Sequence, residues 1–126
     1  AFIWPQLIKS FLKKERKSIV PGGMAHAGEL ETSFFLYKEE GSVRKSEMED
    51  EIGFPKSEFF WLDLVDSPPV NLMEWWSTFS KSGVVGEPTK STKEDGEKYF
   101  KAVIDRMVKL VKEFRERDLR EREDQH

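Results

Sequence analysis

The sequence predicts an α/β fold, because segments typical of buried strands alternate with segments typical of amphipathic helices. Residues 2–4 and 59–65 are aromatic and apolar, as buried strands are. Residues 5–16, 26–37 and 100–114 repeat their apolar side chains at helical spacing. The chain has 126 residues, which is enough for one domain.

The first element is a short strand end, Phe2–Trp4. Because the chain opens there as if inside a β-strand, we expect it to be a fragment, either one half of a longer polypeptide or a product of cleavage. Pro5 then favours a helix start, because its fixed φ suits the first turn and its missing N–H needs no partner there. The helix predicted to follow runs to about Arg16 and ends in four basic residues: Lys13, Lys14, Arg16 and Lys17. These favour a solvated helix end that complements the helix dipole, with an anion site as the alternative.

A second helix is predicted from close to His26 to Tyr37, after the break at Pro21 and two glycines. Residues 44–56 are polar and charged, and we expect an irregular surface segment there. Residues 59–65 are the strong strand candidate, which two prolines end. Residues 75–88 are punctuated by glycine and proline, which predicts a loop. Trp75 and Trp76 lie in that loop, where core packing is favoured over a lid on a ligand.

The last helix has the clearest pattern in the chain. Ser91 and Glu94 have the spacing of a capping box. The apolar residues then keep helical spacing from Phe100 to Phe114, which predicts a helix docked on the core. Residues 115–126 are almost all charged and predict a frayed helical tail, so residues 1–114 form the expected domain.

Composition excludes several classes of function. The 21 basic and 24 acidic residues are too balanced for a nucleic-acid-binding stripe, and no apolar run is long enough to span a bilayer. The absence of cysteine excludes a disulfide scaffold, a cysteine nucleophile and a cysteine-ligated zinc site. With only two histidines, this chain alone cannot build a multi-histidine metal site. We expect a cytoplasmic protein, because no targeting signal is visible.

His26 is the one internal histidine and the candidate catalytic residue. If the helix includes His26, Glu29 returns to its side and Glu31 points elsewhere. A carboxylate partner would orient the ring and raise its pKa, which suits a proton shuttle. Gly22 and Gly23 could let a substrate approach the backbone closely. A capping or packing histidine is the alternative.

Two motifs resemble the signatures of the creatininase (creatinine amidohydrolase) family. Residues 26–33, HAGELETS, resemble its H-[AG]-G-x-x-E-T-S signature, and residues 83–89, GVVGEPT, are similar to its G-V-x-G-[DE]-P-T motif. The resemblance implies a three-layer α/β/α sandwich of creatininase type, of which this chain contributes the C-terminal half. It also implies that His26 binds substrate and transfers a proton, while Glu31 and Thr32 shape the pocket behind it. Creatinine-cleaving members carry a Trp-Asp pair where this chain has Gly22 and Gly23, so a substrate other than creatinine is expected.

The family's metal-binding motifs lie N-terminal to the segment that this chain resembles. The resemblance therefore implies two divalent ions (zinc, manganese or iron), held mainly by an N-terminal half of the same protein, with no metal ligand in this chain. It implies a metal-dependent hydrolase that uses metal-activated water to cleave a C–N or C–C bond of a small, cyclic substrate. A homo-oligomer is expected as well. The alternative is a non-catalytic half-domain or interaction module that lacks the metal-binding half.

Overall fold

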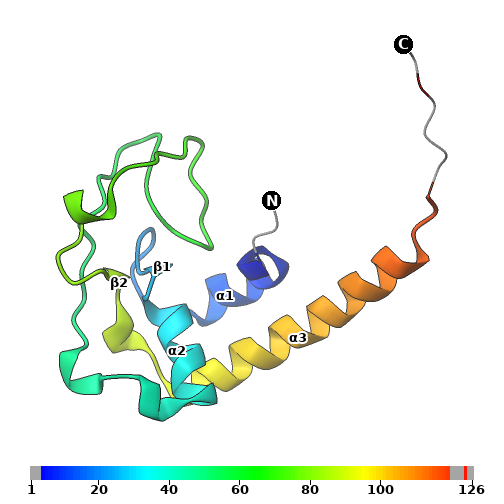
Figure 1. Cartoon of the computed structure of the whole chain (residues 1–126), viewed down its shortest axis with the longest axis horizontal. Helices are drawn as coiled ribbons and strands as arrows, with labels where there is room; N and C mark the ends of the chain where they lie inside the picture. Colours follow the sequence, from blue (N-terminus) through cyan, green and yellow to red (C-terminus); the bar gives the residue numbers. More distant parts are fainter. Residues whose placement is uncertain (1–3, 120–123, 125–126) are drawn as a thin grey trace.

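The computed structural model describes residues 4–119 and 124, and Figure 1 shows the order of their elements. Three α-helices and one two-stranded sheet are joined by short 3₁₀ helices and long irregular segments. The elements that position the site are η1 (Trp4–Ile8), α1 (Lys9–Glu15), β1 (Met24–His26), α2 (Glu29–Lys38), η4 (Trp76–Thr78), β2 (Val85–Gly86), η5 (Pro88–Lys90) and α3 (Lys93–Glu116). Two further 3₁₀ turns, η2 (Glu40–Ser42) and η3 (Lys45–Glu47), lie in the connection after α2.

The helix predicted over residues 5–16 is present, although its first turn, η1, is a 3₁₀ helix rather than an α-helix. Ile8 and Leu12 are buried on its inner face. Trp4 belongs to η1, so the strand predicted over residues 2–4 is wrong at that residue. Residues 2 and 3 lie outside the described part of the chain.

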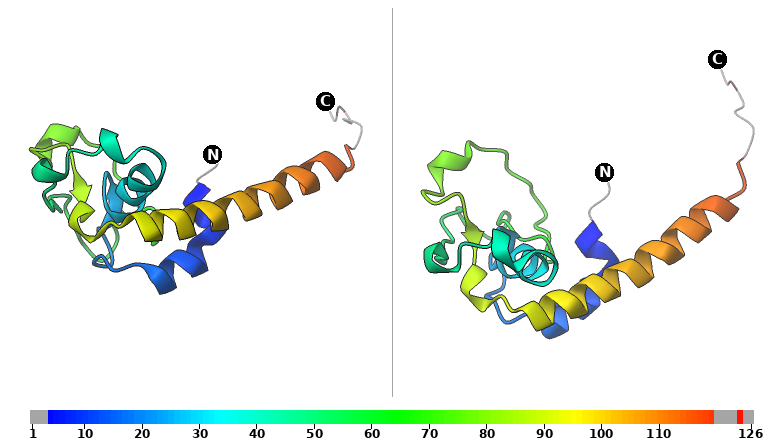
Figure 2. Two further views of the ribbon diagram at one scale, coloured as in Figure 1. Left: turned by 90° about the horizontal axis from the view of Figure 1, so that it is seen from below. Right: turned by 60° about the horizontal axis from the view of Figure 1, so that its bottom comes forward.

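The sheet is smaller than a three-layer sandwich requires. β1 pairs antiparallel with β2, and within the described residues these are its two strands. Helices and a sheet agree with the α/β class, but the three helices and the two-stranded sheet of the described residues are too few to make up a three-layer sandwich. Instead α3 packs on α2 and on η1, as the views in Figure 2 show. Residues 59–65, which were predicted to be a strand, do not join the sheet.

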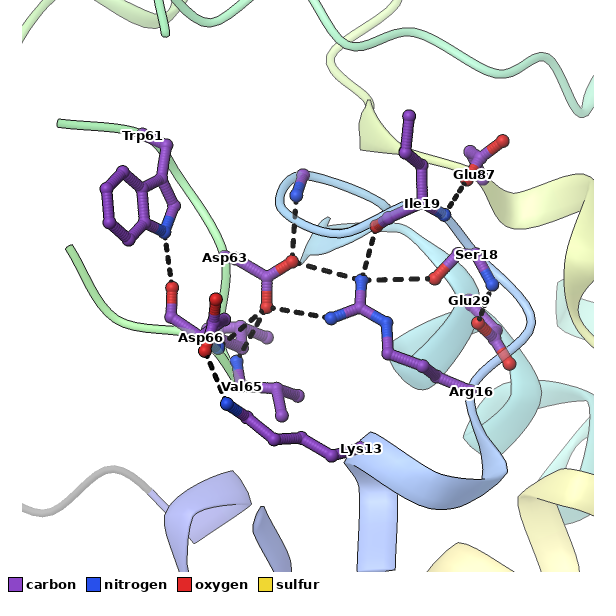
Figure 3. Close-up of polar contacts among 12 residues, drawn as sticks. Lys13, Arg16, Ser18, Ile19, Glu29, Trp61, Asp63, Val65, Asp66 and Glu87 are labelled. Atoms are coloured by element: carbon purple, nitrogen blue, oxygen red, sulfur yellow. Dashed lines mark hydrogen bonds and ion pairs between the residues drawn. The ribbon is translucent and has the colours of Figure 1, made fainter. Parts of the chain in front are cut away.

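The segment 59–65 is irregular because a buried carboxylate organises it as a turn. Asp63 accepts hydrogen bonds from the backbone N–H groups of Val65 at 2.9 Å and of Asp66 at 3.0 Å. The indole of Trp61 donates to the Asp66 carbonyl and closes the same turn (Figure 3). These bonds satisfy locally the backbone groups that a sheet ladder would otherwise use. The strand prediction was therefore wrong, although Val65 is fully buried.

Helices α2 and α3 are in backbone contact. A Cβ atom on Gly96 would lie 1.9 Å from the Ser33 carbonyl oxygen, so only glycine permits this approach. The N-cap of α3 is Thr92, whose Oγ1 accepts from the Asp95 backbone N–H at 3.1 Å. The predicted cap at Ser91 was thus one residue early. The Ser91 hydroxyl donates instead to the Glu29 carbonyl at 3.0 Å and ties α3 to α2.

Two apolar clusters stabilise the chain. The larger cluster joins η1, α1, α2 and α3, and its buried members are Ile8, Leu12, Met24, Leu30, Val65, Tyr99 and Val103. The smaller cluster lies around β2 and consists of Ala25, Phe54, Phe79 and Val85. β1 contributes one residue to each cluster, Met24 and Ala25, because successive strand side chains point to opposite faces. The strand that carries His26 is therefore anchored on both faces. Within the described residues, no helix is long and apolar enough to cross a membrane.

Candidate functional site

His26 is the last residue of β1 and not part of a helix, so the helix predicted from His26 begins three residues too early. Its side chain is 55% exposed. Ala27 follows with φ +49°, in the left-handed region that few non-glycine residues adopt. This turn sends the chain from β1 into α2 and leaves the imidazole at the surface beside the start of α2.

The two nearby glutamates have exchanged the roles that helical spacing predicts. Glu31 faces His26, with 3.7 Å between Glu31 Oε2 and His26 Nδ1. Glu29 is fully buried and points away. The reason is the turn at Ala27, which breaks the helical relation between His26 and α2.

The segment behind the imidazole is held by two side chains of the same motif. Glu31 Oε2 accepts a hydrogen bond from the Ala27 backbone N–H at 2.7 Å. Thr32 Oγ1 donates to the Ala27 carbonyl at 2.9 Å. Both backbone groups of the left-handed residue are thus satisfied from the first turn of α2. One carboxylate therefore fixes the turn and also presents negative charge to His26 Nδ1.

Trp76 is a neighbour of His26 that sequence reasoning did not find. The two rings meet edge to face, with 4.9 Å between their centroids. The indole Nε1 donates to the Gly83 carbonyl at 2.9 Å, and the ring also contacts Phe79 at 5.0 Å between centroids. The preceding residue, Trp75, is 83% exposed, so core packing was the wrong interpretation for it. The adjacent tryptophans were the only signal in the sequence, and their spacing could not show which one reaches the histidine.

Gly22 and Gly23 precede β1 in a tight, buried turn. Gly22 has φ +119° and donates its N–H to Asp63 Oδ2 at 2.8 Å. The Gly23 carbonyl accepts from the backbone N–H groups of Glu87 at 3.0 Å and Glu29 at 3.3 Å. A substrate could reach this backbone only if the turn opened. The structure gives these glycines a packing role, and their substrate contact stays a prediction.

The two sequence motifs meet as one structural unit. Val85 pairs with His26 and Gly86 with Met24 in the β1–β2 ladder. A Cβ atom on Gly86 would lie 2.6 Å from the Gly28 Cα atom, so the two backbones touch where the motifs cross. Glycine is needed at this crossing because any side chain would separate β2 from the start of α2.

A buried ion pair supports the turn from beneath. Arg16 Nη2 lies 3.0 Å from Asp63 Oδ2, and both side chains are almost completely buried. Arg16 also donates to the Ile19 carbonyl at 2.6 Å, as Figure 3 shows. The prediction of a solvated helix end is therefore wrong at Arg16, whose side chain is buried. Lys13 pairs with Asp66 and Lys17 with Asp95, so carboxylates of the chain already take the place of an external anion.

Glu29 of α2 connects its helix to the segment after α1 and to α3 without reaching the surface. Its carboxylate accepts hydrogen bonds from the backbone N–H groups of Lys17 at 3.0 Å and Ser18 at 2.8 Å, and from the Tyr99 hydroxyl at 3.1 Å. Burial, and secondarily the Glu29 charge, raises the pKa of Tyr99 above its ordinary value, so the phenol stays a donor. Glu29 is thus a structural residue beneath the site.

A surface groove begins beside the left-handed turn. Its volume is about 660 Å³, which is within the range of small-molecule sites, and its lining includes Ala27, Thr32, Phe35, Arg44 and Ser82. Apolar and polar groups contribute about equally to its surface. Among the described residues, however, no three His, Asp or Glu side chains are grouped so that they could hold a metal ion.

Comparison with family models identifies the class of protein to which this fold and site belong. Residues 2–111 match the family described as Creatininase: Creatinine amidohydrolase. The chain belongs to the creatininase family. No curated protein and no solved structure gave a significant match to it. The family has the α/β fold and suggests amidohydrolase activity.

Proposed function

We propose that the chain forms the substrate-side part of an amidohydrolase that cleaves the C–N bond of a small, cyclic substrate, with His26 as its catalytic residue. Family membership supports the hydrolase class. The observation that carries the assignment is the position of His26, which is exposed at the end of β1 and has Nδ1 turned toward Glu31. The other ring nitrogen, Nε2, lies on the opposite edge of the imidazole and is the atom proposed to meet the substrate.

The chemistry proposed for His26 is proton transfer. Hydrolysis of an amide adds hydroxyl to the carbonyl carbon and a proton to the leaving nitrogen. Neutral Nε2 would take the proton released by the attacking water and then give it to that nitrogen. The Glu31 carboxylate would stabilise the transient imidazolium from the Nδ1 side, and the Trp76 ring would limit rotation of the imidazole.

The family is generally metal-dependent, but the described residues do not provide a metal site. No step of the proposal therefore passes through a metal. The proposal places the ligands in an N-terminal half of the same protein, which becomes the partner of this chain, and zinc, manganese or iron remain the candidate ions. Since glycines stand where creatinine-cleaving members have a Trp-Asp pair, the proposed substrate is a cyclic amide other than creatinine.

The test is hydrolysis of a panel of cyclic amides by the protein together with any N-terminal part that co-purifies with it. His26→Ala should lower kcat by ~10²–10⁴, the usual contribution of a positioned general acid–base. Added imidazole should restore part of the rate, because it can occupy the space left by the ring. Lys109→Ala, at an exposed position of α3, is the control.

Two results would contradict the proposal. An active His26→Ala enzyme with normal turnover would remove the catalytic assignment. Absence of hydrolysis and of bound divalent ions in the co-purified protein would favour the alternative, a non-catalytic interaction module.

A further inference from the structure

Trp76 reaches His26 from η4, a single 3₁₀ turn in the long connection between α2 and β2. A 3₁₀ turn of three residues has weak hydrogen-bond geometry and does not hold its place by itself. The edge-to-face contact between the two rings therefore depends on the segments that brace η4. One of these segments contains Glu51.

The carboxylate of Glu51 binds the turn that follows η4. Its Oε1 accepts a hydrogen bond from the Lys81 backbone N–H at 2.7 Å, and its Oε2 accepts one from the Ser82 backbone N–H at 3.0 Å. The Ser82 hydroxyl donates to the same Oε2. These bonds, that of the Ser82 hydroxyl first, lower the pKa of Glu51 to about 2, so the carboxylate is ionised at neutral pH. Both of its oxygens are thus engaged by one turn.

The backbone around Glu51 is itself fixed to neighbouring elements. The Glu51 N–H donates to the Gly86 carbonyl at 3.0 Å, and the Glu51 carbonyl accepts from the Gly86 N–H at 2.7 Å. A Cβ atom on Gly53 would lie 1.9 Å from the carbonyl oxygen of Phe79, the residue after η4. The rings of Phe54 and Phe79 also meet, with 4.8 Å between their centroids. Glu51 therefore holds the turn from a backbone that is anchored on β2.

The turn held by Glu51 ends at the hydrogen-bond acceptor of Trp76. The Gly83 N–H donates to Ser80 Oγ at 2.9 Å, and the Gly83 carbonyl accepts from the Trp76 indole N–H at 2.9 Å. Gly83 has φ +91°, and a Cβ atom on it would meet no atom of the described residues within 4 Å. Packing therefore does not hold this end of the turn, and its hydrogen bonds must. A continuous series of contacts thus runs from Glu51 through the turn and Trp76 to His26.

We propose that Glu51 is a positioning residue for His26: its carboxylate holds the turn at residues 80–83 and so keeps Trp76 against the imidazole. The ring is then oriented from two sides, by Glu31 at Nδ1 and by Trp76. The positioning itself does not depend on what His26 does. Its consequence for the reaction rests on the function proposed above, because proton transfer requires Nε2 at a fixed place relative to the substrate.

NMR spectroscopy of the full chain tests the positioning. Glu51→Gln keeps the shape of the side chain but replaces one acceptor oxygen with an amide donor, which cannot accept from Lys81 or Ser82. The ring-proton resonances of His26 should then shift in the same direction as in Trp76→Ala, because both variants lose the indole ring current. In the double variant of Glu51→Gln and Trp76→Ala, these resonances should equal those of Trp76→Ala alone.

Two further variants separate positioning from a general loss of structure, with circular dichroism to establish that each keeps its helices. Glu58→Gln makes the same change of charge at an exposed residue of the same connection and should leave the His26 resonances unchanged. Ser82→Ala removes one hydrogen bond to the carboxylate, so it should give a smaller shift in the same direction.

Native His26 resonances in a folded Glu51→Gln chain, or an additional shift in the double variant, would overturn the proposal. If Glu51→Gln does not fold, Ser82→Ala decides, and native resonances in that variant would have the same meaning.

Hydrolysis by the chain together with any co-purified N-terminal part tests the consequence for the reaction. Glu51→Gln should lower kcat by about 10- to 100-fold and change KM little, since a misplaced catalytic group costs rate more than binding. A native kcat in a Glu51→Gln chain whose His26 resonances have moved would refute the positioning role in catalysis and leave the assignment of His26 intact. If no cyclic amide is hydrolysed, the proposed function fails, and the NMR result still decides whether Glu51 positions the two rings.

Discussion

Glu29 and Glu31 stand two positions apart in the same motif but have opposite environments. Glu29 is fully buried and accepts three hydrogen bonds, two from backbone N–H groups and one from Tyr99. Glu31 lies at the surface, where it fixes the turn at Ala27 and faces His26. The motif therefore combines a residue that supports the fold with one that supports the site.

Substituting the two glutamates should separate stability from activity. Glu29→Ala leaves buried donors unsatisfied, so it should lower the free energy of unfolding by roughly 3 kcal/mol or more. Glu31→Ala should cost about 1 kcal/mol, as the loss of a capping residue does, and should act mainly on catalysis. Urea denaturation of both variants measures the difference. Equal losses of stability would contradict these roles.

Trp76 and Trp75 form a natural pair of test and control. Trp76→Ala removes the edge-to-face contact with His26, an interaction worth about 0.5–1.5 kcal/mol between aromatic rings. The imidazole proton resonances of His26 should shift in NMR spectra, because the indole ring current is lost. Trp75→Ala should leave them unchanged, since Trp75 is 83% exposed. An identical response of His26 to both substitutions would refute the assigned contact.

At the scale of elements, the start of α3 is held by charge. Asp95 is buried and accepts from Lys17, from Lys98 at 3.1 Å and from the Thr92 hydroxyl at 2.7 Å. Burial alone would raise the pKa of Asp95, but hydrogen bonds from Lys17, Thr92 and Lys98 outweigh it and lower the pKa to about 2. The ionised form thus stabilises the helix start and its contact with the segment after α1.

The sign of this shift predicts acid destabilisation. The pKa of Asp95 is lower in the folded chain than in the unfolded chain, where it is near 3.9. Its carboxylate therefore stabilises the folded chain fully above that pH, and this contribution is lost as the pH falls to about 2. The loss should be roughly 2 kcal/mol. The Asp95→Asn variant should be less stable than the native chain at neutral pH. Its free energy of unfolding should also depend less on pH between those two values.

Asp95→Asn should not remove the acid sensitivity completely. The Ser82 hydroxyl, followed by the backbone N–H groups of Lys81 and Ser82, lowers the pKa of Glu51 to about 2, so this group titrates in the same direction. Equilibrium denaturation from pH 5 to pH 2 measures both contributions. An Asp95→Asn chain with the native pH profile would contradict the role of Asp95.

Elements with a strong local signal were predictable from the sequence. The helix at residues 100–114 follows from its apolar spacing alone, and the helix after Pro5 from its apolar face and its N-terminal proline. The strand predicted over residues 59–65 was wrong because Asp63 accepts hydrogen bonds from the backbone N–H groups of its own turn. A hydrophobicity pattern gives no information about such hydrogen bonds. β2 was missed because its pairing with β1 depends on the close contact between Gly86 and Gly28. These glycines belong to two different motifs, so the sequence of either motif alone does not indicate the pairing.

At the scale of the whole molecule, the candidate site depends on contacts between distant segments. The motifs indicated His26 and Glu31, but the approach of Trp76 to His26 spans residues that no local pattern connects. The amphipathic pattern of the last helix likewise predicted docking on the core without showing that one stripe would stay exposed. Both features arise because the turn at Ala27 and the direction of α3 are set by tertiary packing.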